Sequence, residues 1–413
     1  MSSTIFISAG EASGEHYGAL LIDELIRQSK AQEHEVPPRF IGMGGERMET
    51  AGLERIVKAE DVAVMGLTEV VRHLPRIWRE FQKLKAAIRR EHPAVAILID
   101  FPEIHLRLAR LFHSLGIPVV YFVPPQIWAW KQHRVRLIQR YVTRLAVIFP
   151  FEEAFYRSHG VAAEFVGHPL AELPLPTATR EEFAAANGLA SACTWVGLLP
   201  GSRPHEIRDH LPELLRTASL LTHQQPDTHF EFLVPLAPTL NEPQRQQVRA
   251  YIQEHSQEHD LALPIHLVAD ARATLHHARV SAVASGTATV EAALIGNPFV
   301  VVYRVSPLTY AIAKRVVKVT RVAMANLIAG RDIVPELLQN DFRAEKIVQH
   351  LRVLLPDGPA RQSMMQDLKS VREALRPDAE NCNAAGSGAV QRVAAIVLEE
   401  LSGAARASTP TAS

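Results

Sequence analysis

Short apolar runs rich in valine, isoleucine and phenylalanine recur along the chain, and amphipathic stretches of helical period separate them. This alternation is typical of βαβ units, which build parallel sheets covered by helices. Helices are expected over 17–28 and 103–115, and from residue 342 onward the pattern is helical only. The expected strands are Thr4–Ser8, Arg39–Ile41, Val95–Ile99, Val119–Val123, Leu145–Phe149, Glu164–Val166, Trp195–Leu199, Phe230–Val234, His266–Val268, Ser281–Ala284 and Phe299–Tyr303.

The length of 413 residues predicts two domains of the α/β class rather than one large core. A proline-containing stretch, HPLAELPLPTAT, separates two sets of alternating segments. We expect a Rossmann-like domain over 1–170, a linker over 171–190, a second Rossmann-like domain over 191–341, helices over 342–402 and a disordered tail over 403–413. Doubly wound sheets bind ligands beyond the carboxyl ends of their strands, so loops that follow strands should face a cleft between the domains.

Composition narrows the classes of function. Lys and Arg total 44, as do Asp and Glu, so the formal net charge is zero and nothing global indicates a nucleic-acid partner. Two distant cysteines, Cys193 and Cys382, argue against a disulfide framework and a cysteine-based metal site. No signal-peptide pattern is present, and no apolar run reaches the roughly 18–20 residues that span a bilayer. Any membrane contact is therefore expected at the surface of the bilayer.

Two loops of the second domain suit an anionic ligand. Ser202 and Arg203 follow a strand and precede a helix that begins near Pro204, so backbone N–H groups, a hydroxyl and a guanidinium come together. A turn with a solvated arginine is the alternative, and this triplet alone favours it. The second loop carries Ser285, Gly286 and Thr287 at a helix start, where free N–H groups would bind a diphosphate.

Glu291 lies one helical turn beyond that second loop, among apolar neighbours. A carboxylate at this depth suits ribose hydroxyls, and the whole pattern suits a nucleoside diphosphate better than a dinucleotide. An ordinary capped helix explains Thr287 but explains Glu291 poorly. Further along, Asn326 is expected in a short loop, MANLIAGRD, from which its amide reaches a ligand.

The first domain offers carboxylates at strand ends. Asp100 ends an almost wholly apolar strand, where a partly desolvated carboxylate can act as a general base. Capping of the following helix is the alternative, and position favours the base. The loop AGEASGEHYG over 9–18 is either a polar turn with a helix cap at Ser13 or part of a substrate site. In VPPQIWAWKQHR, Trp128 and Trp130 either stack on a ligand or, as the safer interpretation, fill the core.

An amphipathic stretch follows Gly66. Its apolar stripe contains Leu67, Val70, Val71, Leu74, Ile77, Trp78 and Phe81, and its basic side contains Arg72, Arg76, Arg79 and Lys83. A basic face beside a tryptophan suits the surface of an anionic bilayer. An ordinary surface helix is equally compatible with the pattern, and Pro75 predicts two shorter helices rather than one.

Eight segments together resemble the lipid-A-disaccharide synthase family. In chain order they are AGEASGE, IGMGG, ILIDFPE, PPQIWAW, FVGHP, LLPGSR, ASGTATVE and NLIAGRDIVPELLQ, between Ile5 and Gln339. The resemblance implies a GT-B glycosyltransferase with two Rossmann-like domains facing across a cleft. It also implies transfer of a diacylated glucosamine from UDP to C6 of 2,3-diacylglucosamine 1-phosphate, with inversion, in lipid A biosynthesis. The family is peripheral on the cytoplasmic face of the inner membrane and is associated with a homodimer that exchanges C-terminal segments.

The resemblance also implies roles for individual residues. Asp100 matches the proposed base, and Glu11 becomes a second candidate; Ser13 and Gly14 fall on the acceptor side. Ser202, Arg203, Ser285, Gly286, Thr287, Glu291 and Asn326 fall on the UDP side. The stripe residues Leu67, Val70, Val71, Leu74, Arg76 and Trp78 become membrane contacts. No cofactor and no metal are implied, and no Asp-x-Asp occurs in the chain.

The chain departs from the family pattern at Glu15, His105 and Ala325. Two other functions share the expected architecture. A UDP-GlcNAc 2-epimerase or similar UDP-sugar enzyme would have a soluble substrate and no need of an amphipathic stripe. A non-catalytic, membrane-associated UDP-sugar binding protein would keep Ser285–Glu291 but tolerate loss of Asp100.

Overall fold

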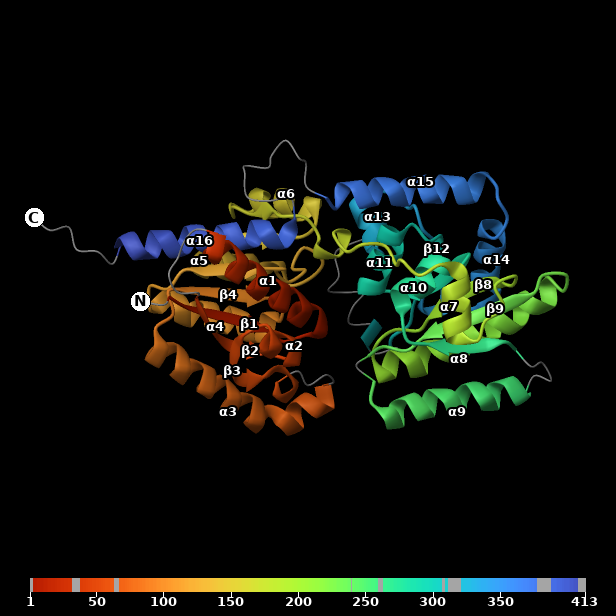
Figure 1. The fold of residues 1–413 in the computed structure, drawn as a ribbon, viewed down its shortest axis with the longest axis horizontal. Helices are drawn as coiled ribbons and strands as arrows, with labels where there is room; N and C mark the ends of the chain where they lie inside the picture. Colours follow the sequence, from red (N-terminus) through yellow and green to blue (C-terminus); the bar gives the residue numbers. More distant parts are fainter. Residues whose placement is uncertain are drawn as a thin grey trace, which may run out of the picture. The chain divides into compact units, whose positions relative to one another are not determined.

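The computed structural model describes residues 3–31, 38–62, 67–238, 240–258, 263–306, 309–310, 321–376 and 388–407. The chain divides into two compact units: unit 1 comprises Met1–Glu172 with Leu375–Ser413, and unit 2 comprises Leu173–Ala374. Each unit is built on a parallel sheet flanked by helices (Figure 1). The predicted α/β class with two Rossmann-like doubly wound domains is confirmed.

Unit 1 has a seven-stranded sheet in the order β3-β2-β1-β4-β5-β6-β7. Its strands are β1 Thr4–Ala9, β2 Arg39–Gly44, β3 Leu53–Lys58, β4 Val95–Ile99, β5 Val119–Phe122, β6 Arg144–Val147 and β7 Glu164–Phe165. Its helices are α1 Ala12–Ala31, α2 Glu46–Thr50, α3 Leu67–Glu91, α4 Pro102–Ser114, α5 Val135–Tyr141, α6 Pro150–Ser158 and α16 Ala389–Ala407, with 3-10 turns at Ala59–Asp61, Gln132–Arg134 and Pro169–Ala171.

Unit 2 has a six-stranded sheet in the order β10-β9-β8-β11-β12-β13. Its strands are β8 Thr194–Leu199, β9 Phe230–Pro235, β10 Ile265–Val268, β11 Val280–Ala284, β12 Phe299–Tyr303 and β13 Glu336–Leu338. Its helices are α7 Arg180–Asn187, α8 Pro204–Gln224, α9 Glu242–Glu258, α10 Ala271–His277, α11 Thr287–Ile295, α13 Met324–Ala329, α14 Ala344–Leu354 and α15 Pro359–Ala374, with a 3-10 turn at Gln339–Asp341.

The central strands of both sheets carry the continuous apolar runs. Every residue of β4 is fully buried, because helices cover both faces of a parallel sheet. The strand order reverses between β1 and β4 in unit 1 and between β8 and β11 in unit 2. Ligands of doubly wound sheets bind at such a reversal, beyond the carboxyl ends of the strands. The loops after these four strands carry most of the residues singled out above.

The segment 171–190 is not a plain linker. Unit 2 begins at Leu173, and the segment contains α7, whose first residues form a capping box. Glu182 N–H donates to Thr179 Oγ1, and Thr179 N–H donates to the Glu182 carboxylate. The sequence T-R-E-E carries this signature, which the flanking prolines obscured.

The C-terminal helices divide between the units. Helices α14 and α15 belong to unit 2, whereas α16 packs against α1, β4 and β5 of unit 1 (Figure 1). They therefore do not form one helical region over 342–402. Two edge strands, β3 and β13, escaped prediction. Pro75 does not split α3, which runs unbroken from Leu67 to Glu91, since a proline removes one hydrogen bond while its neighbours remain.

Among the described helices, none combines the length and apolar character needed to cross a bilayer. Within the same part of the chain, no group of three or more His, Cys, Asp or Glu side chains is arranged to hold a metal ion.

Candidate functional site

The turn between β4 and α4 carries Asp100. Two successive non-glycine residues, Asp100 and Phe101, have left-handed φ angles of 53° and 48°. Such angles cost about 1–3 kcal/mol each and persist only where the surroundings enforce them. Phe101, rather than Asp100, occupies the N-cap position of α4, so Asp100 is not placed as an ordinary helix cap.

Hydrogen bonds to the Asp100 carbonyl enforce this turn. His105 Nδ1 lies 2.6 Å from that oxygen, and the Tyr121 hydroxyl donates to it at 2.8 Å. The other imidazole nitrogen, Nε2, lies 2.8 Å from Ser8 Oγ. Burial lowers the pKa of His105 to about 4, so the ring is neutral at neutral pH.

The β1–α1 loop lies directly beside this turn, because Ala9 pairs with Ile99 across the two strands. Gly10 permits the approach: a Cβ atom there would lie 2.4 Å from the Phe101 ring. Glu11 is partly buried just before α1, and Ser13 and Gly14 lie in the first turn of that helix. The structure therefore brings the sequence-predicted acceptor-side residues and Asp100 to one edge of the unit 1 sheet.

Glu15 has a local structural task. Its carboxylate accepts a hydrogen bond of 2.8 Å from Arg47 N–H in the first turn of α2. An anion at that position offsets the positive end of the helix. This departure from the family pattern thus links α1 to α2 within unit 1.

The two tryptophans in the loop after β5 have different environments. Trp128 is buried and donates from Nε1 to Glu152 at 3.0 Å, so it belongs to the core. Burial raises the pKa of Glu152 to about 7, although three donated hydrogen bonds oppose the shift. Trp130 is 42% exposed, with Lys131 Nζ 4.1 Å from its ring centroid. Only the second indole is available to a ligand.

In unit 2 the β8–α8 loop differs from expectation. The N–H groups of Ser202 and Arg203 both donate to the Glu206 carboxylate, at 3.0 and 3.2 Å. Glu206 thereby caps α8 from within, so these N–H groups are not open to an anion. The Ser202 side chain is exposed, and the Arg203 guanidinium lies 3.4 Å from Glu206.

The β11–α11 loop keeps its helix start open. Its N-cap is Gly286, which has no side chain to cap the helix, and its φ of 147° is one that glycine adopts without strain. Ser285 N–H donates to Val302 across the sheet, which fixes the loop. The positive end of α11 is therefore the better anion site of the two.

Glu291 lies further along α11 and is partly buried. Burial raises the pKa of its carboxyl; the Arg272 charge opposes this shift and Asp270 adds to it. Arg272 belongs to the first turn of α10, which packs against α11. Its Nη1 is buried without a hydrogen-bond partner in the described part of the chain.

Asn326 does not occupy a loop. It lies on α13 with 1% exposure, donates from Nδ2 to Val334 O and Glu336, and accepts from the N–H groups of Ile333 and Val334. These four bonds use the amide fully, because an amide offers two donors and two acceptor lone pairs. Asn326 therefore braces the segment before β13 and is not available to a ligand.

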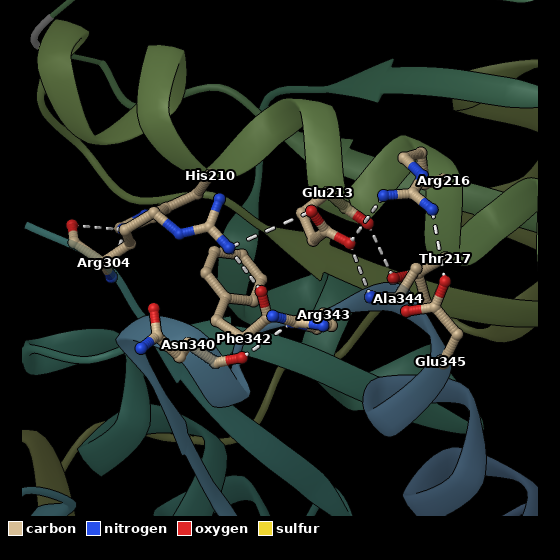
Figure 2. Close-up of polar contacts among 10 residues, drawn as sticks. All are labelled: His210, Glu213, Arg216, Thr217, Arg304, Asn340, Phe342, Arg343, Ala344 and Glu345. Atoms are coloured by element: carbon tan, nitrogen blue, oxygen red, sulfur yellow. Dashed lines mark hydrogen bonds and ion pairs between the residues drawn. The ribbon is translucent and has the colours of Figure 1, made fainter.

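A polar network that was not predicted from the sequence links α8 to Arg304 and to the start of α14 (Figure 2). His210 on α8 donates from Nδ1 to Pro200 O at 2.7 Å and accepts from Arg304 N–H at 3.0 Å. Glu213 accepts from Ala344 N–H at 2.6 Å, at the start of α14. Glu206, His210, Glu213 and Thr217 share the buried face of α8 at spacings of three and four, and this polar stripe was the available signal.

The outer face of α3 is apolar and basic. Leu74 is 51% and Trp78 is 65% exposed, one helical turn apart. Ile77 and Phe81, predicted in the same stripe, instead pack on the core. Arg76 pairs with Asp61, and Arg79 and Lys83 are exposed. The side chains of Leu67, Val70 and Val71 lie outside the described part of the structure.

Comparison with known proteins gives a consistent result. The family model described as lipid-A-disaccharide synthetase matches residues 5–390. A lipid-A-disaccharide synthase of Acidobacterium capsulatum is 59% identical over 402 residues, 96% of each chain. That of Koribacter versatilis is 48% identical over 385 residues, 92% of this chain and 95% of the relative.

Solved structures agree on the fold. A UDP-N-acetylglucosamine 2-epimerase of Listeria monocytogenes, described as putative, superposes with a TM-score of 0.59 at 11% identity, over 99% of this chain and 98% of that one. The kitacinnamycin glycotransferase gives 0.60 at 15% identity, over 97% and 99%. From the match along nearly its whole length, the chain belongs to the lipid-A-disaccharide synthetase family of glycosyltransferases.

Proposed function

We propose that this glycosyltransferase condenses UDP-2,3-diacylglucosamine with 2,3-diacylglucosamine 1-phosphate, giving the β-1,6-linked disaccharide 1-phosphate and UDP. The observation that carries the proposal is the placement of Asp100. Its turn follows a central strand at the strand-order reversal of unit 1, in a strained conformation held by buried hydrogen bonds. Strain maintained at this position is typical of a site rather than of an ordinary loop.

In the proposed reaction, the Asp100 carboxylate removes the proton of the acceptor 6-hydroxyl. The oxygen attacks the anomeric carbon of the donor as the bond to the diphosphate breaks, and UDP leaves with the bonding electrons. Attack opposite the leaving group inverts the configuration. Glu11, in the neighbouring loop, is the alternative base, and Ser13 and Gly14 line the acceptor side.

The donor nucleotide is assigned to unit 2. The open start of α11, with Ser285, Gly286 and Thr287, binds the diphosphate, where the helix dipole offsets the charge that develops as UDP leaves. The partly buried carboxylate of Glu291 accepts hydrogen bonds from ribose hydroxyls. Arg203 and the Ser202 hydroxyl add to the diphosphate site from the neighbouring loop.

Both substrates carry acyl chains, which favours action at a bilayer. We assign the exposed Leu74 and Trp78, flanked by Arg76, to contact with an anionic surface. The protein is then peripheral on the cytoplasmic face of the inner membrane. A homodimer is the proposed oligomeric state.

The test is release of UDP from the diacylated donor in detergent micelles, with and without the acceptor. Acceptor-dependent release with a disaccharide product is expected. Asp100→Asn should lower kcat by about a thousandfold and leave UDP affinity unchanged, because loss of a general base affects only the transition state. Glu11→Gln is the matched control. Wild-type turnover in the Asp100 variant with loss in the Glu11 variant would transfer the base role to Glu11.

A further inference from the structure

The carbonyl oxygen of Asp100 accepts hydrogen bonds from two buried side chains at once. Two side chains from different elements, His105 on α4 and Tyr121 on β5, bond to this one oxygen at 2.6 and 2.8 Å. Asp100 and Phe101 are both left-handed around it. The peptide that joins these two residues sets the direction in which the Asp100 side chain leaves the backbone. Any group that holds the peptide therefore aims the carboxylate.

The hydrogen positions on His105 follow from its partners. A carbonyl oxygen accepts only, so Nδ1 carries the proton and donates to Asp100 O. Nε2 then has a free lone pair and accepts from the Ser8 hydroxyl at 2.8 Å. Burial lowers the pKa of His105, which keeps the ring in this neutral form at neutral pH.

The His105 imidazole also supports the β1–α1 loop indirectly, through the ring of Phe101. The Phe101 ring stands edge-on to His105, with 5.8 Å between centroids and 81° between planes. The same Phe101 ring lies against Gly10, one residue before Glu11. His105 thus supports both loops that carry a candidate base, while its own complete burial keeps it from contacting substrate.

We propose that His105 is a positioning residue for the transfer reaction: its Nδ1–H, with the Tyr121 hydroxyl, holds the Asp100 backbone so that the carboxylate faces the acceptor hydroxyl. The inference rests on the proposed function, because it gives Asp100 the role of base. It adds that the donor at position 105, rather than the ring or its charge, is the feature that turnover requires.

Two substitutions separate this role from simple packing. Asparagine places Nδ2–H the same two bonds from Cβ as histidine Nδ1, so His105→Asn keeps the donor while it removes ring volume. His105→Leu fills more apolar volume but offers no donor. If His105 only fills space, the activity of the variants should depend on side-chain volume. If His105 positions the Asp100 turn, activity should depend on whether the side chain at 105 can donate a hydrogen bond.

The experiment measures kcat, KM, UDP affinity and Tm for both variants and the wild type. We expect His105→Leu to lose about a hundredfold in kcat with near-wild-type KM and UDP affinity, since small misplacements of a catalytic group cost this much. His105→Asn should keep most of the wild-type kcat, even with the lower Tm. Equal losses that follow Tm in the two variants would overturn the inference.

Tyr121→Phe keeps the inference testable if leucine prevents folding. It removes the second donor to the same carbonyl with little change of volume, and we expect about a tenfold lower kcat at unchanged UDP affinity. Wild-type kcat in Tyr121→Phe, or in a folded His105→Leu, beside an inactive Asp100→Asn, overturns this inference alone. A fully active Asp100→Asn overturns the base assignment and this inference with it.

Discussion

At the scale of single residues, burial of His105 makes the free energy of unfolding depend on pH in the mildly acidic range. Its pKa is about 4 in the folded chain against 6.5 for an unperturbed histidine. Between these values the unfolded chain binds a proton that the folded chain does not, so the free energy of unfolding falls as the pH drops through this window. The full effect is about 3 kcal/mol, and it is absent above pH 6.5.

Comparison with His105→Asn isolates this effect, because asparagine does not titrate and the remaining groups are shared. We expect the wild type to lose about 3 kcal/mol more than the variant between neutral pH and about pH 4, measured by chemical denaturation. Parallel losses in the two chains would show that His105 protonates equally in the folded and unfolded states.

Residues also differ in how far the sequence reveals them. Asp100, Glu11, Ser285 and Gly286 follow apolar strand runs, and this spacing alone places them at the carboxyl ends of the strands. The partners of Ser202 N–H and of Asn326 depend on contacts with residues further along the chain. For Ser202 the spacing S-R-P-H-E is compatible with capping by Glu206. The contacts of Asn326 with Val334 and Glu336, by contrast, arise from the tertiary fold and leave no signal in the sequence.

At the scale of elements, α3 presents an apolar pair in a basic surrounding. We expect wild-type protein to bind vesicles that contain anionic lipid, and Leu74→Ser with Trp78→Ser to weaken binding at least tenfold, since a buried large side chain contributes about 1.5–3 kcal/mol. Sedimentation with vesicles at two salt concentrations measures this, and salt should weaken the wild-type interaction.

Val353→Ser is the matched control for that experiment. Val353 is 56% exposed on α14 of unit 2, so it tests exposure of an apolar side chain outside α3. Neither set of changes should alter Tm. Vesicle binding by the double variant at the wild-type level would remove α3 from the membrane contact.

Elements at the edges of the sheets were the hardest to predict. Strand β3 has two buried, two partly buried and two exposed residues, and β13 has three residues after a proline, so neither shows the apolar run that marked the central strands. Central strands are buried on both faces and leave a continuous apolar signal; edge strands are set by pairing with a neighbour, which the sequence pattern does not record.

At the scale of the whole molecule, the chain completes unit 1 only at its C-terminal end. Helix α16 buries Val393 and Val397 against unit 1, and Arg144 pairs with Glu399 and Glu400. The two units therefore depend on different C-terminal helices, although each has its own core. A destabilising substitution in one of these helices is therefore expected to destabilise only the unit to which that helix belongs.

Val397→Asp tests that separation. An unpaired carboxylate in the buried face of α16 should destabilise unit 1 by roughly 3–5 kcal/mol, because a buried charge without a partner is costly. Hydrogen exchange should then accelerate in β1 and β4, while unit 2 strands and UDP affinity stay unchanged. Val348→Asp, on the buried face of α14, should produce the reverse pattern. Equal loss of protection in both units after either substitution would mean that they unfold as one cooperative body, in which the division of the C-terminal helices has no thermodynamic consequence.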